Sequence, residues 1–72
     1  MFRLRVKEVI KNQGKTVGWV ARKAGLSHSV VRRMVKDPNY TPQASTLLKV
    51  ARVLKCSLED LIEYIPEEEQ EA

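Results

Sequence analysis

The sequence predicts an all-α fold: a compact five-helix domain over residues 1–65, followed by an acidic disordered tail over residues 66–72. Three observations predict it. Apolar residues recur every three or four positions, which is the period of an amphipathic helix. Residues typical of helix starts and stops interrupt that pattern at short intervals. No strand pattern, internal repeat or second domain accompanies them, and 72 residues allow only one small core.

The first two helices follow from an apolar stripe and a pair of boundary residues. The stripe is made of Leu4, Val6, Val9 and Ile10. Its spacing predicts a first helix that ends near residues 12–14. Thr16 can cap a second helix that runs to Ala24. Gly25 suits the left-handed residue that commonly follows a helix end.

Three further helices are predicted after Gly25. Ser27 can cap a helix that runs to about residue 35 or 36, and residues 37–40 read as a loop. Thr41 followed by Pro42 predicts the start of a fourth helix, because proline is tolerated at the first helical position. Ser57 resembles a capping-box residue, with Asp60 as its partner, at the start of a fifth helix that Pro66 ends. The buried face of that helix would be Leu58, Leu61, Ile62 and Ile65.

Charge is distributed unevenly along the chain. All thirteen lysines and arginines lie between Arg3 and Lys55, where only Glu8 and Asp37 oppose them. From Glu59 onward there are seven acidic residues and no basic one. This asymmetry indicates a polyanionic partner, although solvated helix faces and a solubilising tail would give the same composition.

Composition also limits the chemistry that we expect. Cys56 is the only cysteine and His28 the only histidine, so we expect no intrachain disulfide, no metal site and no cofactor. No paired acid and base or phosphate-binding glycine loop is present, so we expect no enzyme. A lone thiol fits a reducing compartment. With no spanning segment or signal peptide, we expect a soluble cytoplasmic protein without membrane contact.

The third predicted helix has two distinct faces on a helical wheel. Its apolar face carries Val30, Val31, Met34 and Val35, and its polar face carries His28, Ser29, Arg32, Arg33 and Lys36. A helix with such a basic face fits the major groove of DNA, where arginine bonds bidentately to guanine. An ordinary surface helix would look similar, as would one that binds membranes or acidic proteins.

The residues around this helix resemble the helix-turn-helix of the Cro and lambda-repressor-like family, also called the XRE family. The matching residues are Val20, Ala21, Ala24, Gly25, Leu26, Val31 and Met34. The similarity continues through residues 41–51 and 54–61, and in total covers roughly residues 4–63. It implies a five-helix lambda-repressor-like fold and sequence-specific binding of double-stranded DNA by a transcriptional regulator.

The resemblance also implies which residues contact DNA. The family's base-reading positions correspond here to Ser27, His28, Ser29, Arg32 and Arg33. Its phosphate contacts correspond to Thr16, Val17, Lys36, Asn39, Tyr40, Thr41 and Gln43. The family often has glutamine where this chain has Val17, so one phosphate-binding side chain is missing. Backbone N–H groups at the helix starts of Thr16 and Thr41 can still hold phosphates.

Several functional alternatives remain open at the level of sequence. We expect a homodimer that reads a palindrome, and Trp19, Tyr64 and Ile65 are candidates for a dimer or partner contact. For Trp19 the favoured alternative is packing on a neighbouring helix within the domain. The main rival function is an antitoxin that binds a toxin and regulates its own operon. An RNA-binding adaptor is disfavoured because the aromatic residues are too few for a stacking platform.

Overall fold

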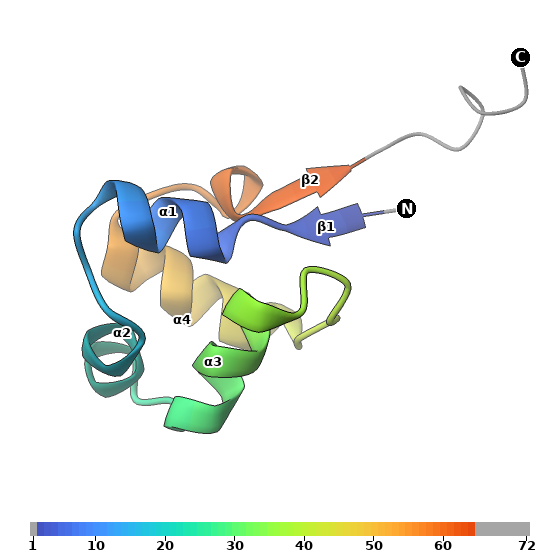
Figure 1. The fold of residues 1–72 in the computed structure, drawn as a ribbon. Helices are drawn as coiled ribbons and strands as arrows, with labels where there is room; N and C mark the ends of the chain where they lie inside the picture. The colour runs from blue at the N-terminus through green and yellow to red at the C-terminus, as the bar shows by residue number, and fades with distance from the viewer. Residues whose placement is uncertain (1, 65–72) are drawn as a thin grey trace, which may run out of the picture.

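A computed structural model describes residues 2–64 and contains, in that range, four α-helices, one 3₁₀ turn and two short strands (Figure 1). In chain order these are β1 (Phe2–Leu4), α1 (Val6–Asn12), α2 (Val17–Ala24), α3 (His28–Lys36), α4 (Ala44–Leu54), η1 (Leu58–Leu61) and β2 (Ile62–Tyr64). The prediction of a helical domain is confirmed. The count of five helices was wrong by one, because the fifth segment is a 3₁₀ turn that leads into a strand.

The boundaries of α2 and α3 are those predicted from their capping residues. The Oγ1 atom of Thr16 accepts a hydrogen bond from the Trp19 N–H at 3.0 Å. The Oγ atom of Ser27 accepts one from the Val30 N–H at 3.2 Å. Between the two helices, Gly25 takes the left-handed conformation, with φ 69° and ψ 33°. Each interaction satisfies a terminal backbone group that the helix itself leaves unpaired.

The start of the fourth helix was predicted incorrectly. Thr41 and Pro42 lie in the loop after α3, and α4 begins at Ala44 with Gln43 as its N-cap. Proline fixes its own φ but not the ψ of the next residue, and Gln43 has an extended ψ of 150° that separates Pro42 from the helix. At its other end α4 stops at Leu54, and Lys55 follows in the left-handed region at φ 55°.

The two strands are the main departure from the prediction. β1 and β2 pair antiparallel, with Phe2 opposite Tyr64 and Leu4 opposite Ile62. The first helix therefore starts at Val6 instead of Leu4. Aromatic and β-branched residues at these positions favour a pleated surface, and the pairing joins the two ends of the described range. The alternation of charged and apolar residues at the N-terminus was the available signal for β1.

The predicted capping box of the fifth segment is confirmed, although it caps a 3₁₀ turn. The Ser57 N–H donates to Asp60 Oδ2 at 3.1 Å, and the reciprocal Ser57 contact is also present. The predictions for Ile65, for termination at Pro66 and for the tail at residues 66–72 lie outside the described residues.

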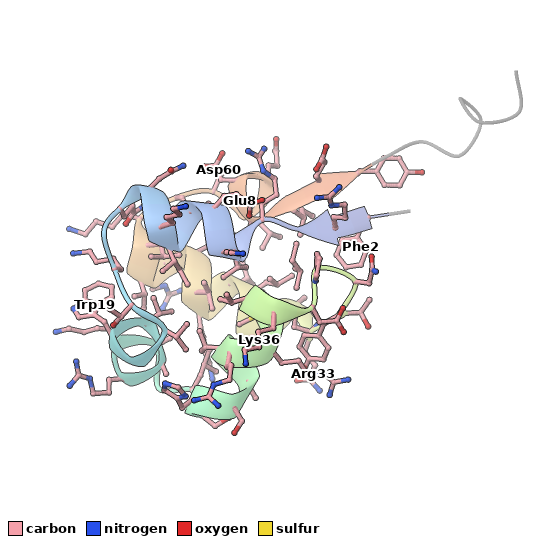
Figure 2. The ribbon with its side chains drawn as sticks, viewed as in Figure 1. Phe2, Glu8, Trp19, Arg33, Lys36 and Asp60 are labelled. Atoms are coloured by element: carbon pink, nitrogen blue, oxygen red, sulfur yellow. The ribbon has the colours of Figure 1, made fainter. Side chains whose placement is uncertain are left out.

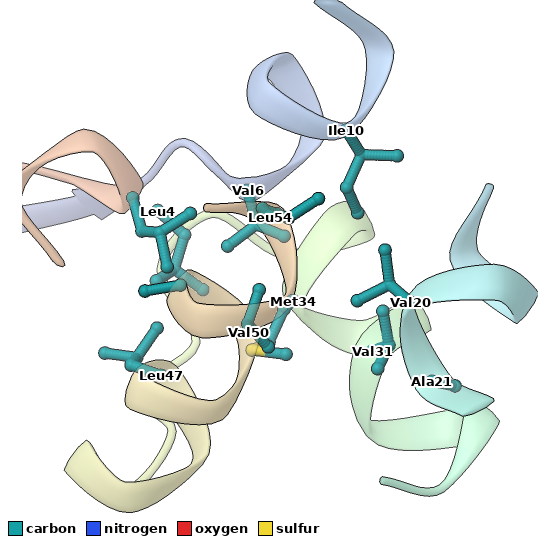
Figure 3. Close-up of a cluster of buried hydrophobic side chains, with 12 residues drawn as sticks. Leu4, Val6, Ile10, Val20, Ala21, Val31, Met34, Leu47, Val50 and Leu54 are labelled. Carbon is teal, nitrogen blue, oxygen red and sulfur yellow. The ribbon is translucent and has the colours of Figure 1, made fainter. Parts of the chain in front are cut away.

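One hydrophobic core joins the elements, and it determines which side of α3 faces outward. Figure 3 shows buried side chains from β1, α1, α2, α3 and α4 meeting at its centre. On α3, Val31 and Met34 are 0% and 1% exposed. They contribute to the same cluster as Val20 and Ala21 of α2. Because both inward positions of α3 are filled, its polar residues must point away from the domain. No helix among the described residues is long and apolar enough to cross a membrane.

Candidate nucleic-acid interface

The polar face predicted for the third helix exists as an exposed face of α3. Every predicted base-reading residue is solvent-exposed: Ser27, His28, Ser29, Arg32 and Arg33. Lys36, in the last turn, is exposed as well. Val30 and Val35 are half-buried at the margins of this face and pack against the core. The arrangement offers three cations along a helix of nine residues.

The first turn of this face is organised by a contact between His28 and Arg32. The Nη2 atom of Arg32 lies 3.4 Å from Nδ1 of His28. A guanidinium has only donors, so Nδ1 must be the acceptor in this contact. The His28 ring also lies against α2, since a Cβ built on Gly18 would be 3.9 Å from its Cδ2 and Nε2 atoms. The Nε2 side of the ring therefore lies beside α2, and its Nδ1 side contacts Arg32.

The last turns of α3 contact the loop that follows. The Arg33 guanidinium stacks on the ring of Tyr40, with 4.5 Å from Cζ to the ring centroid. Figure 2 shows Arg33 extending from α3 on the side of this loop. The loop is ordered by an Asp37 turn, in which Oδ1 accepts from the Asn39 N–H at 3.1 Å and the backbone carbonyl from the Tyr40 N–H at 3.0 Å. Tyr40 is half-buried against the core and forms a fixed platform.

The residues predicted to contact phosphates flank α3 in two groups. Thr16 is exposed and Val17 half-buried at the start of α2, whereas the rest lie at the end of α3 and in the loop to α4. Figure 1 places these two groups on either side of α3. In the second group Tyr40 is half-buried, and the exposed members are Lys36, Asn39, Thr41 and Gln43. Because α4 begins at Ala44, the helix-start N–H groups expected at Thr41 lie instead just after Gln43.

The charge distribution in three dimensions matches this interface. Helices α2, α3 and α4 contain no acidic residue. Among the described residues, the carboxylates belong to Glu8, Asp37, Glu59, Asp60 and Glu63. Figure 2 shows Glu8 and Asp60 on the opposite side of the molecule from Arg33. The three helices nearest the candidate interface are therefore free of carboxylates, and Asp37 in the loop after α3 is the acidic residue next to the α3 face.

The other predicted contact residues do not lie on the α3 face. Trp19 is half-buried against the core, with the Lys15 Nζ atom 4.4 Å from its ring centroid. It borders a surface hollow next to the end of α4, whose other lining residues are Gln13, Lys15, Val53, Leu54 and Lys55. Tyr64 is 66% exposed on β2, and Ile65 lies outside the described range. Trp19 thus packs against the core and also lines the hollow.

Sequence analysis missed two features of the site. It did not find that the His28 ring lies beside Gly18 of α2, because a glycine carries no pattern of its own. It also assigned Arg33 and Tyr40 to separate roles, whereas they stack on each other. An arginine within a few residues of a loop tyrosine was the only available signal, and cation–π contacts of this kind are common.

The single cysteine lies between α4 and η1, outside the elements that form this interface. Cys56 is a half-buried free thiol, and burial, followed by the nearby Asp60 carboxylate, raises its pKa. In the part of the chain that the structure describes, no three His, Cys, Asp or Glu side chains gather where they could hold a metal ion.

Comparison with known proteins identifies the family. A structural match is the crystal structure of a candidate DNA-binding protein from Bacteroides fragilis, which is 28% identical in sequence. The match has a TM-score of 0.78 and covers 88% of this chain and 100% of that one. No curated protein matches. The sequence profile of the Cro/C1-type helix-turn-helix DNA-binding domain matches residues 5–67, so the chain belongs to this family of DNA-binding regulators.

Proposed function

We propose that the protein is a sequence-specific transcriptional regulator that inserts α3 into the major groove of double-stranded DNA. The observation that supports this is the exposed basic face of α3, whose opposite side is buried in the core through Val31 and Met34. A helix anchored in this way enters the groove without losing its packing. The unpaired Cys56 thiol favours the cytoplasm as the place of action.

Phosphate contacts and base contacts have separate tasks in this proposal. Thr16 and Val17 at the start of α2, together with the α3–α4 loop, would grip the backbone on either side of the groove and set the register. Phosphate contacts of this kind carry affinity without sequence information. The α3 face then reads base edges, for which bidentate arginine–guanine bonds are the strongest selective contacts.

We further propose that the protein acts as a two-fold dimer and represses or activates nearby promoters. The small core and the exposed Tyr64 support self-association. A dimer would read inverted half-sites about one helical turn, roughly 34 Å, apart. Sedimentation tests this: a monomer both alone and on its selected DNA would exclude the dimer.

Selection of binding sites from a random duplex pool tests the DNA-binding function directly. We expect one enriched motif with inverted halves, and affinity that falls steeply with added salt because counterions are released. A double variant, Arg32→Ala with Arg33→Ala, should lose the enrichment. The matched control is Arg5→Ala with Lys11→Ala, which removes the same charge from exposed positions outside α3. An unenriched wild-type pool, or equal losses in both variants, would refute the proposal.

A second candidate function is an antitoxin or another protein-interaction module that controls its own operon. The hollow beside Trp19 favours it, because it combines apolar Val53 and Leu54 with Lys15 and Lys55. Co-expression with the product of an adjacent gene, followed by size-exclusion chromatography, distinguishes the two. A stable complex that Trp19→Ala abolishes, while DNA binding persists, would support this function. A wild-type protein that elutes alone would count against it.

A further inference from the structure

We propose that the two adjacent arginines of α3 perform different tasks, with Arg32 as the base reader, positioned by His28, and Arg33 as a phosphate clamp, positioned by Tyr40. The inference rests on the proposed DNA-binding function and deepens it. Sequence alone treats the two residues as equivalent, since both are exposed cations on the same helical face. Their contacts in the folded domain separate them.

Arg32 is held toward the N-terminal half of α3. Its Nη2 atom lies 3.4 Å from Nδ1 of His28, four residues earlier on the same face. Helical side chains lean toward the N-terminus, so this contact follows the natural direction of the arginine. The first turn of a recognition helix is the part that usually meets base edges. The remaining guanidinium donors of Arg32 are thus presented where the bases lie.

His28 can orient Arg32 because its own ring is held in place. Its Cδ2 and Nε2 atoms lie beside Gly18 on α2, at 3.9 Å from where a Cβ on that residue would stand. Because a guanidinium can only donate, Nδ1 is the acceptor in the contact with Arg32. His28 therefore acts as a positioning residue, and an acceptor at the place of Nδ1 is the property that matters.

Arg33 is directed away from the first turn. Its guanidinium lies 4.5 Å from the Tyr40 ring centroid, on the platform that the Asp37 turn orders. Stacking on an aromatic face fixes the plane of a guanidinium while leaving its edge donors free. Those donors then lie beside the loop whose exposed residues Asn39 and Thr41 are proposed to meet the DNA backbone. At this position the guanidinium donors are placed to bind a phosphate of the DNA backbone.

The test compares single variants on the selected site and on each of its single-base changes, over a series of salt concentrations. Arg32→Ala should flatten discrimination at one base pair of the half-site by about 5- to 150-fold, the value of a bidentate contact. Arg33→Ala should weaken binding equally on all sequences and lower the slope of log K against log salt by about 1, without altering discrimination. Arg5→Ala, outside α3, is the charge-matched control and should change neither quantity.

His28 is tested by rescue. His28→Ala should reduce discrimination at the base pair that Arg32 reads, whereas His28→Asn should keep it, because the Asn Oδ1 atom can replace Nδ1 as acceptor. Combined with Arg32→Ala, His28→Ala should cause no further loss, as expected for coupled residues. Circular dichroism confirms that each variant is folded.

Two kinds of failure are distinguishable in this design. If the wild type enriches no sequence, the proposed function fails, and the division of tasks fails with it. If the wild type is selective but Arg33→Ala flattens a base position, or His28→Asn behaves like His28→Ala, only the division of tasks is overturned.

Discussion

Alanine substitutions at Gly25 and Gly18 should change stability in opposite directions. Gly25 joins α2 to α3 at φ 69°, and a Cβ there would meet nothing within 4 Å. The cost of Gly25→Ala is therefore purely conformational, about 1–2 kcal/mol for a left-handed L-residue. Gly18 lies in the first turn of α2, and its new Cβ would make only ordinary contact with His28 at 3.9 Å. Gly18→Ala should stabilise the domain by about 0.5 kcal/mol through helix propensity.

Thermal and urea unfolding, followed by far-UV circular dichroism, measures both effects. At about 4–8 °C per kcal/mol for a domain of this size, Gly25→Ala should lower Tm by about 4–16 °C. Gly18→Ala should raise Tm by roughly 2–4 °C. The urea slope should stay constant in both variants, because the surface exposed on unfolding is unchanged. A neutral Gly25→Ala, or a Gly18→Ala variant as unstable as Gly25→Ala, would refute the assigned backbone conformations.

Three further predictions concern the core, the end of α4 and the free thiol. Lys55→Gly should increase the free energy of unfolding by about 1 kcal/mol, because Lys55 is left-handed at φ 55°. The urea midpoint should therefore rise, and a lower midpoint would contradict this prediction. Met34→Ala should lower the free energy of unfolding by about 2–5 kcal/mol, since Met34 is 1% exposed in the core. An unchanged urea midpoint would show that its site is not tightly packed. Burial and Asp60 raise the pKa of Cys56. The alkylation rate of the folded protein should therefore increase at a higher pH than that of the unfolded chain. Asp60→Asn should shift this profile partly back, and a folded-state profile at or below the unfolded one would contradict the prediction.

Helix boundaries that depend on neighbouring residues were predictable. The caps of Thr16 and Ser27 each bond to a backbone N–H three residues later, so the whole interaction lies within one turn of the sequence. Gly25 is equally local, because a left-handed residue commonly follows a helix end and glycine adopts that conformation most readily. The same logic failed at Thr41 and Pro42, where the loop backbone at the next residue is extended and delays the helix.

Contacts between distant segments were not predictable from local patterns. Ile62 and Tyr64 fit a helical stripe as well as a strand, and the choice was made by Phe2 and Leu4 at the other end of the described range. Tertiary pairing overrode the helical period there. The β1–β2 pair and the loss of a fifth helix therefore share one cause.

The sequence by itself determined the helical class, the family resemblance and the division of the third helix into apolar and basic faces. Those properties follow from the order of residues along one helix, so they do not depend on where any other element lies. Only the tertiary structure decided that the His28 ring lies against α2 and that Arg33 stacks on Tyr40. The wheel assigns both arginines to one face, but it carries no information about the loop or α2, whose positions are set by the shared core.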